Sequence, residues 1–348
     1  MRIVILIRAL ALAGAERQAI LTARSLVERG HQVWVVLLRH DAGHRAELET
    51  AGVHVVSLDN AGLVTVLRTI VRLTRLLRRV RPAAVYGFMD GPNVLVSTVV
   101  HVVPGAVRAC GVRASDLALR DMPWLSRVLY RIEPWITRAS DVVIVNSSAG
   151  YNAARQRGFS ARRLCLIPNG IDTAYFRRDE EGGTELRQEL GIASDEVVIG
   201  RVGRLHPMKG YDTLIDSLAQ LRAKGVRFRA LCVGTGGLEQ ALRDRAERAG
   251  VAGVISWLPP RPDLRGVYSA CDVVVSSSRY GEGLPNVIAE AMAAYVLAQA
   301  LVDFEGALIV VAHDRHLLSA ATDQWMLVAD GRLAPFEGDL DDYKEWSR

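Results

Sequence analysis

The sequence has few cysteines, and its apolar runs are short. Only four of its 348 residues are cysteine. They lie dozens of residues apart, without the spacing that a zinc site or a disulfide framework requires. No run reaches the roughly 18 to 20 apolar residues of a membrane-spanning helix. Glycine and proline number 30 and 12, too few for a collagen-like or low-complexity chain. We therefore expect a cytoplasmic globular protein, and its length is sufficient for two hydrophobic cores.

The amino end also lacks the features of a signal peptide. Its first apolar run, Ile3 to Ile7, is short and is followed within ten residues by Glu16 and Arg17. A cleavable leader needs a longer apolar stretch and a small-residue cleavage site. The pattern indicates a buried first strand instead.

Basic residues outnumber acidic ones before residue 295, and acidic residues outnumber basic ones after it. Residues 295–348 carry ten acidic side chains against four basic ones, a net charge of −6, whereas the first 294 residues carry +11. Such a shift marks an acidic tail or a boundary between segments of different origin.

Two series of alternating strands and helices indicate an α/β fold of two Rossmann-like domains with parallel sheets. We expect the first domain at 1–168, a linker at 169–195 that starts after Pro168, and the second domain at 196–294. The linker contains the turn residues Asn169-Gly170 and a charged stretch. Predicted strands are residues 1–6, 33–38, 53–58, 84–88, 107–112, 142–146, 164–167, 197–202, 229–233, 254–258 and 273–276, with helices at 16–28 and 63–80.

A basic loop follows the strand predicted at 197–202. It carries Arg204 and Lys209, and a loop at the carboxyl end of a parallel strand is where such sheets bind ligands. A guanidinium fork and a mobile ammonium group suit a diphosphate whose charge grows as a leaving group departs. The alternative is an ordinary solvated basic loop.

A second candidate segment is 282–290, after the strand predicted at 273–276. Pro285 suits the first helical turn, so the amides of Gly283 and Leu284 would form an anion site. The carboxylates of Glu282 and Glu290 can accept hydrogen bonds from sugar hydroxyls. The alternative is a capped helix with a surface glutamate.

Four segments together resemble the family-four retaining GT-B glycosyltransferases. They are 14–17 (GAER), 169–172 (NGID), 203–210 (GRLHPMKG) and 282–290 (EGLPNVIAE). The resemblance covers residues 1–294, and its most specific element is the pair of glutamates eight positions apart. It implies a GT-B fold and a transferase that moves a sugar from a nucleotide-sugar donor to an acceptor, with retention of anomeric configuration.

The resemblance also implies roles for individual residues. Arg204 and Lys209 would hold the diphosphate, Glu282 the transferred sugar and Glu290 the ribose, and the catalytic group would be Glu282, Arg204 and Lys209. Gly14 would let the first loop approach the donor phosphates, although the familiar form has two adjacent glycines where this chain has Ala13-Gly14. The full predicted donor-binding set is Gly14, Arg204, Lys209, Glu282, Gly283, Leu284, Asn286 and Glu290, with Arg113 on the acceptor side.

No metal or other cofactor is expected. The resemblance implies that basic residues and a helix amino terminus do the work of a divalent ion. The only Asp-x-Asp is Asp339 to Asp341, in the tail. The nucleotide sugar is then a substrate.

Residues 295–348 depart from that family and resemble the carboxyl end of an ABC-F ATPase nucleotide-binding domain. In that family the position of His313 senses the γ-phosphate, but this chain has no G-x₄-G-K-[ST] phosphate loop, which argues against ATP hydrolysis. We expect a chimera in which a helical stretch at 295–304 and a strand at 307–312 complete the truncated second domain as a βαβ-like tail. The alternative function is a non-catalytic protein that at most binds nucleotide sugar.

The stretch from Leu63 to Arg81 alternates apolar residues with six arginines at helical spacing and contains no acid. A basic amphipathic helix of this kind can lie on an anionic leaflet. We expect peripheral contact with the inner face of a membrane, a saccharide or lipid-linked acceptor, and no nucleic-acid partner. The alternative is a helix packed on its sheet with a solvated arginine-rich face.

Overall fold

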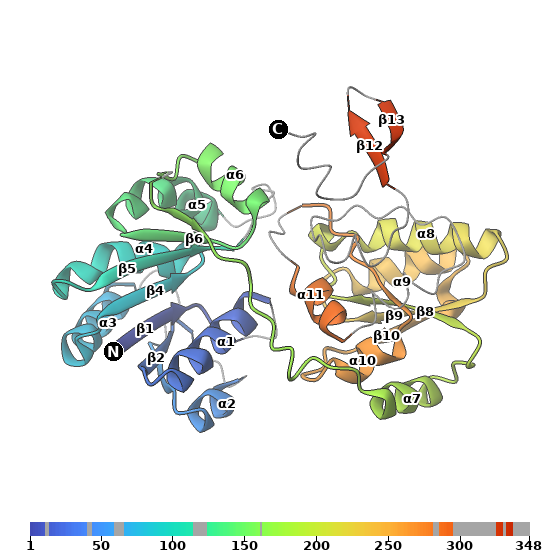
Figure 1. Ribbon diagram of the computed structural model, residues 1–348, viewed down its shortest axis with the longest axis horizontal. Coiled ribbons are helices and arrows are strands. Elements are labelled where there is room, and N and C mark those ends of the chain that lie inside the picture. Colours follow the sequence, from blue (N-terminus) through green and yellow to red (C-terminus); the bar gives the residue numbers. More distant parts are fainter. Residues whose placement is uncertain are drawn as a thin grey trace. The chain divides into compact units, whose positions relative to one another are not determined.

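The structure is a computed structural model that describes residues 1–10, 14–39, 44–58, 66–113, 124–160, 162–280, 285–294, 325–329 and 332–336. It divides into two compact units. The first comprises residues 1–172, 206–211 and 277–287, and the second comprises residues 173–205, 212–276 and 288–348. Figure 1 shows the α/β architecture within each unit.

The first unit contains a parallel seven-stranded sheet in the order β3-β2-β1-β4-β5-β6-β7. Helices cover both faces of this sheet (Figure 1). Its elements are β1 (Arg2–Ile7), α1 (Gly14–Glu28), β2 (Gln32–Leu37), α2 (Arg45–Thr50), β3 (His54–Ser57), α3 (Val66–Val80), β4 (Ala84–Phe88), α4 (Asp90–Val99), β5 (Val107–Val112), α5 (Trp124–Ile136), β6 (Val142–Val145), α6 (Ser148–Gln156) and β7 (Leu164–Leu166).

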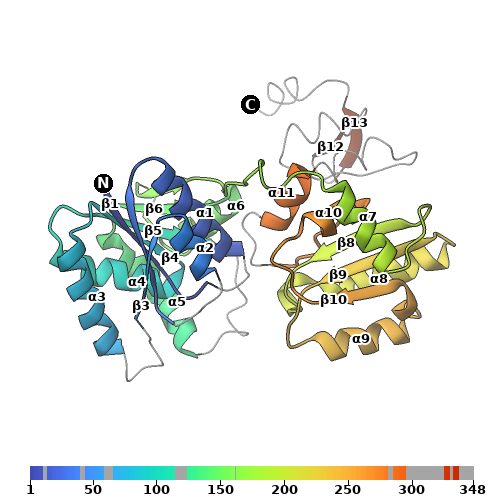
Figure 2. The same cartoon turned by 90° about the horizontal axis from the view of Figure 1, so that it is seen from below.

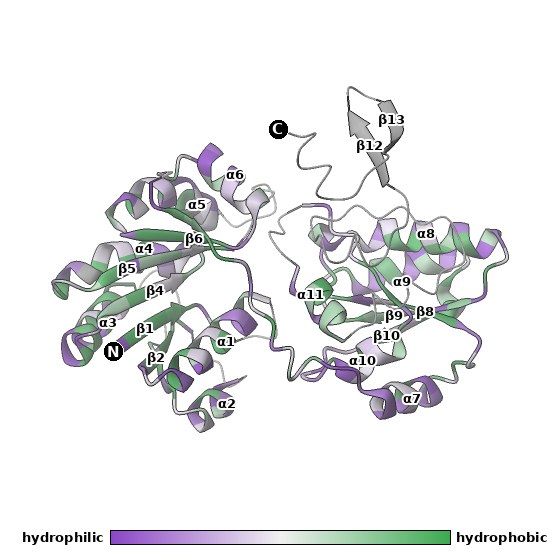
Figure 3. Cartoon of the chain, viewed as in Figure 1, coloured by the Kyte–Doolittle hydropathy of each residue, from purple (hydrophilic) through white to green (hydrophobic). Residues whose placement is uncertain are grey.

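Alternate side chains of β1 contribute to the hydrophobic cores on the two faces of this sheet. Ile3, Ile5 and Ile7 belong to the cluster with residues of α1 and α2, whereas Val4 and Leu6 belong to the cluster with residues of α3 and α4. Successive side chains of a strand point to opposite faces, so a strand covered on both sides is apolar throughout. Figure 3 shows the strands as hydrophobic and much of the outer helix surface as hydrophilic.

The second unit has a parallel four-stranded sheet in the order β10-β9-β8-β11. Figure 1 shows α8 and α9 on one side of this sheet and α7 and α10 on the other, and Figure 2 shows the strands β10, β9 and β8 side by side. The elements are α7 (Glu180–Glu189), β8 (Val197–Val202), α8 (Tyr211–Ala223), β9 (Phe228–Val233), α9 (Glu239–Arg248), β10 (Ile255–Leu258), α10 (Arg265–Ala270), β11 (Val273–Val274) and α11 (Asn286–Ala293). The first two residues of α11 belong to the first unit.

Part of the predicted linker 169–195 is a helix. Asp179 caps α7 by accepting a hydrogen bond from the Gly182 amide, and Gly183 packs so closely on α10 that a Cβ would meet the Ser269 backbone. The two glycines and the high charge of this stretch favour a loop by local propensity. The close contact with α10 overrides that propensity.

The described part of the tail is an antiparallel pair, β12 (Trp325–Ala329) and β13 (Arg332–Phe336). The helical stretch predicted at 295–304, the strand predicted at 307–312 and His313 lie outside the described residues. Among the helices that the structure describes, none is long and apolar enough to cross a membrane.

Three of the four cysteines are buried. Cys110, Cys232 and Cys271 lie in the interior, and Cys165 on β7 is exposed. Burial raises the pKa of the Cys110 thiol and raises those of Cys232 and Cys271 to about 12. The three interior thiols are therefore protonated at neutral pH.

Candidate functional site

The strand order of the second sheet identifies where a ligand can bind. The chain runs from β8 to β9 on one side, and β11 lies on the other side of β8. In open parallel sheets, ligands bind at the carboxyl ends of the strands where this order reverses. The loop after β8 begins at this switch point, and it contains the predicted Arg204.

Two loops in the second unit meet backbone to backbone. The Leu205 amide donates to the Thr235 carbonyl oxygen at 3.0 Å. A Cβ on Gly234 would collide with the Gly203 carbonyl oxygen, and one on Gly236 would collide with the Leu205 carbonyl oxygen. Only glycine permits this approach. The loop after β9 therefore supports the loop that carries Arg204.

Arg204 is exposed on that support. Among the described residues it has no hydrogen-bond or ion-pair partner. A guanidinium that is positioned by its backbone but not engaged by a carboxylate is available to an anion. Arg204 therefore lies in the loop after β8, and its role in binding a diphosphate stays a prediction.

Lys209 belongs to the first unit and ends a short 3₁₀ turn, Pro207–Lys209. His206 caps this turn by accepting a hydrogen bond from the Met208 amide at 3.2 Å. Gly210 follows in the left-handed region, with φ +61°, and a Cβ there would collide with the Ser277 carbonyl oxygen. The Ser277 hydroxyl donates to the Lys209 carbonyl oxygen at 3.1 Å. These contacts fix the backbone at Lys209.

Glu290 is buried in the second unit, with 2% of its surface exposed. Its carboxylate accepts a hydrogen bond of 2.7 Å from the hydroxyl of Tyr268, which is fully buried on α10. Burial of a carboxylate is costly unless it is hydrogen-bonded. Tyr268 supplies such a bond and holds in one orientation the Glu290 carboxylate, which is predicted to bind the ribose.

Gly14 and Asn286 meet within the first unit. The Asn286 side-chain amide donates to the Gly14 carbonyl oxygen at 2.9 Å, and its oxygen accepts a 2.6 Å hydrogen bond from Asn169. Asn286 is 8% exposed. Its side chain therefore orders the start of α1, which is a structural contact that the predicted donor-binding role did not include.

Arg113 continues the same network. It donates to the Asn169 side-chain oxygen at 2.6 Å and to the Tyr86 hydroxyl at 2.8 Å, and its guanidinium lies 4.7 Å from the centroid of the Phe88 ring. Burial raises the pKa of Tyr86, and the charge of Arg113 opposes that rise. The structure thus brings together three predicted site residues: Gly14, Asn286 and Arg113.

A buried carboxylate lies near the same sheet. Glu133 accepts 2.7 Å hydrogen bonds from Asn93 and from Arg157. Burial, reinforced by the nearby charge of Asp90, raises the pKa of Glu133 to about 7. Burial likewise raises the pKa of Asp90, which begins α4 and is separated from β4 by one residue.

The remaining predicted residues lie outside the described part of the chain: Glu282, Gly283 and Leu284. In the described ranges no three His, Cys, Asp or Glu side chains are grouped as a metal ion would require. The absence of a metal requirement stays a prediction.

Sequence reasoning missed several residues of these networks. Asn169 was interpreted as a turn residue, and its side chain instead joins Arg113 to Asn286. The glycines after β9 had a usable signal, since a Gly-x-Gly-Gly run directly follows a strand. Tyr268 and Glu133 had none, because their partners are distant in sequence.

Each unit matches a family model of known glycosyltransferases. Residues 12–175 match Glycosyltransferase Family 4, and residues 183–331 match Glycosyl transferases group 1. A D-inositol 3-phosphate glycosyltransferase of Corynebacterium urealyticum is 32% identical over 225 residues, which are 59% of this chain and 53% of the relative. The chain spans about half or less of the length of the curated glycosyltransferases it matches.

A second kind of relative matches a short segment. Over 50 residues, 14% of this chain, the sequence is 58% identical to "Probable ATP-binding protein YheS" of Escherichia coli K12, of which the match covers 8%.

Among solved structures, Anabaena Alr3699/HepE in complex with UDP and glucose has a TM-score of 0.73 and 25% identity. The likeness covers 84% of this chain and 78% of HepE. With a glycosyltransferase family model matched on each of its two Rossmann-like halves, this chain has the fold of the GT-B glycosyltransferases.

Proposed function

We propose that this chain transfers a sugar from a nucleoside diphosphate sugar to an acceptor hydroxyl, with retention of anomeric configuration. The observation that carries the proposal is the exposed Arg204 on a glycine-supported loop at the switch point of the second sheet. HepE was solved with UDP and glucose and with UDP-glucose, which supports a UDP-sugar as the donor.

The proposed reaction requires the protein to stabilise a leaving diphosphate. The bond between C1 of the sugar and the β-phosphate oxygen breaks, and its electron pair leaves with the nucleoside diphosphate. The acceptor oxygen bonds to C1, and its proton passes to the leaving diphosphate. Negative charge grows on the diphosphate, so Arg204 and Lys209 stabilise the transition state more than the ground state.

The donor's sugars are held by carboxylates in this proposal. Glu290 accepts hydrogen bonds from the ribose hydroxyls, and its hydrogen bond from Tyr268 keeps the carboxylate in place. Glu282 contacts the transferred sugar, and the amides of Gly283 and Leu284 face the phosphates. Asn286 acts by ordering the chain at Gly14.

The acceptor is a saccharide or a lipid-linked sugar, which binds on the side of Arg113. The guanidinium of Arg113 is held by Asn169 and Tyr86, and this arrangement suits recognition of hydroxyl or phosphate oxygens.

Calorimetric titration of the full chain with UDP and UDP-glucose tests the donor site. Arg204→Ala should weaken binding at least tenfold, because a charge-assisted hydrogen bond contributes about 1.5 to 3 kcal/mol. Arg248→Ala is the matched control, since Arg248 is also an exposed arginine of the second unit. Equal affinities for both variants would contradict the site. The anomeric configuration of the product, read by NMR, tests retention.

One observation favours a second candidate. The segment similar to YheS and the acidic composition of residues 295–348 support a fusion of two unrelated coding segments. In this second proposal the chain binds nucleotide sugar but does not transfer it.

Release of UDP from UDP-glucose, with a panel of saccharide acceptors, separates the two candidates. Replacing residues 295–348 with the carboxyl end of a family-four enzyme should raise the rate at least tenfold if the tail impairs catalysis, which is about 1.4 kcal/mol in the activation barrier. A parent chain as fast as the repaired one would exclude the impaired chimera.

A further inference from the structure

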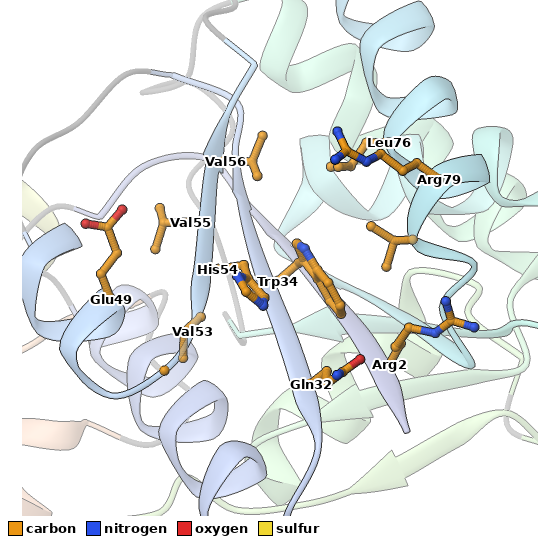
Figure 4. Close-up of a pocket in the computed structure, with 12 residues that line it drawn as sticks. Arg2, Gln32, Trp34, Glu49, Val53, His54, Val55, Val56, Leu76 and Arg79 are labelled. Atoms are coloured by element: carbon orange, nitrogen blue, oxygen red, sulfur yellow. The ribbon is translucent and has the colours of Figure 1, made fainter.

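The first unit has a hollow at the amino ends of β1, β2 and β3, on the face that α3 covers. Its volume is about 770 Å³. Figure 4 shows Arg2, Trp34 and His54 reaching it from the three strands, and Arg79 from the last turn of α3. The rings of Trp34 and His54 stack with centroids 4.8 Å apart. The hollow thus combines a flat aromatic floor with two guanidinium groups.

Both arginines are available to a ligand. Arg2 and Arg79 are exposed, and within the described ranges neither guanidinium group has a hydrogen-bond or ion-pair partner. Among the described residues that line the hollow, the one carboxylate is that of Glu49, which lies on the opposite side of Trp34 (Figure 4) and is paired with Arg45 at 2.9 Å. The side of the hollow that holds Arg2 and Arg79 is therefore positively charged.

The outer face of α3 continues this charge. The helix has no acidic residue in its sequence, and Arg68, Arg72, Arg75 and Arg78 are exposed on it. A second hollow, of about 550 Å³, is lined by Arg78 and Arg81 beside the helix end. A surface with several exposed arginines on a helix that contains no acidic residue attracts polyanions or anionic membranes.

Two apolar side chains on α3 favour an anionic membrane over a soluble polyanion as the partner of this surface. Leu67 and Val71, one helical turn apart, are 76% and 45% exposed. At 100° per residue they share the outer face with the arginines. A soluble phosphate would leave both in water, whereas a bilayer interface buries apolar residues beside basic ones. Long arginine side chains reach the headgroups while such residues enter the acyl boundary.

We propose that the hollow of Arg2 and Arg79 binds the headgroup phosphate of an anionic phospholipid, with the outer face of α3 lying on the bilayer surface. The guanidiniums bind the phosphate oxygens, and the Trp34 ring lies in the interfacial layer where tryptophan is favoured. The site is at the amino ends of the strands, whereas Arg113 follows the carboxyl end of β5. A strand of six residues is about 20 Å long, so the lipid site is separate from the proposed transfer site.

Co-sedimentation of the full chain tests this with vesicles of phosphatidylcholine alone and of two parts phosphatidylcholine to one part phosphatidylglycerol. We expect binding to the anionic vesicles only, weakening as salt is added. The hollow variant carries Arg2→Gln and Arg79→Gln. The control variant carries Arg68→Gln and Arg75→Gln, and it loses the same amount of charge outside the hollow. The hollow variant should lose at least ten times more affinity than the control.

Equal losses in the two double variants would overturn the headgroup site and leave only a general electrostatic attraction. Absence of binding to anionic vesicles at low salt would overturn the proposal altogether. Glycerol 3-phosphate provides the soluble arm: if it raises the unfolding temperature through Arg2 and Arg79 while vesicles do not bind, the ligand is a free phosphate and the lipid assignment is wrong. All the substituted side chains are exposed, and circular dichroism verifies that each variant folds.

Discussion

The Asn286 side-chain amide donates a hydrogen bond to the carbonyl oxygen of Gly14, 272 positions earlier in the chain. The same side chain accepts from Asn169, and Asn169 accepts from Arg113. One asparagine therefore connects the start of α1 with the residues that follow β5 and β7. The side chain of Asn286 thus joins, directly or through Asn169, three segments that are remote in sequence: those of Gly14, Asn169 and Arg113.

Asn286→Ala should lower the stability of the folded chain by about 1 to 3 kcal/mol, because it leaves the Gly14 carbonyl and the Asn169 amide without this partner. The midpoint of urea unfolding measures the change. Asn152→Ala on the exposed side of α6 is the control and should have little effect. Equal shifts for the two variants would show that the network does not stabilise the fold.

Glu133 predicts how stability changes with pH. Its folded pKa of about 7 lies above the usual value of 4.5, so the folded state binds more protons than the unfolded state between these values. The stabilisation is complete below about pH 4.5 and is lost as pH rises through 7. Glu133→Gln removes this titration and keeps an acceptor oxygen for one of the two donors, Asn93 and Arg157, at the same level at every pH.

The free energy of unfolding of Glu133→Gln should therefore rise relative to that of the parent chain as pH increases from 4.5 to 8. The upper bound is about 3 kcal/mol, since one pKa unit corresponds to 1.36 kcal/mol. Urea titrations at four pH values measure it. Parallel curves would mean that Glu133 is ionised in the fold throughout this range.

Gly236→Ala should disturb the loop after β8, because the added methyl group would collide with the Leu205 carbonyl oxygen. We expect lower stability and at least tenfold weaker binding of UDP-glucose. Gly237→Ala is the matched control, since a Cβ at Gly237 would meet nothing within 4 Å. If Gly236→Ala bound donor as tightly as Gly237→Ala, the loop after β9 would not support the Arg204 loop.

Cys165 should be the one thiol of the folded chain that reacts rapidly. It is exposed, whereas the other three are buried with raised pKa values, and the thiolate is the reactive form. Titration with Ellman's reagent should count one thiol in buffer and four in denaturant. More than one rapid thiol in buffer would indicate that an interior segment opens.

Strand positions were predictable because their signal is local. Residues 84–88, 107–112 and 197–202 were predicted as strands and are β4, β5 and β8 with the same bounds. Mainly apolar runs of this length are typical of parallel strands buried on both faces, although Arg108 interrupts β5 and Arg201 interrupts β8. The GT-B fold was predicted from motif resemblance and is confirmed by the solved relatives.

Site partners were less predictable because tertiary contacts decide them. Arg204 was predicted as a site residue from its place after a strand, but the Tyr268 hydroxyl that holds Glu290 comes from another helix. The helix inside the predicted linker forms because α10 packs on it. The sequence around Gly182 and Gly183 contains no local pattern from which that contact could be predicted.

The glycine-mediated contact between the loops after β8 and β9 bears on how binding begins. The Gly203 amide donates to the Val233 carbonyl oxygen and the Leu205 amide to that of Thr235. Both protons should exchange slowly with deuterium in the unliganded chain, since exchange requires these bonds to open. A loop already held in this way loses little conformational entropy when an anion arrives. Association with a diphosphate at Arg204 would then be limited by encounter rather than by folding of the loop.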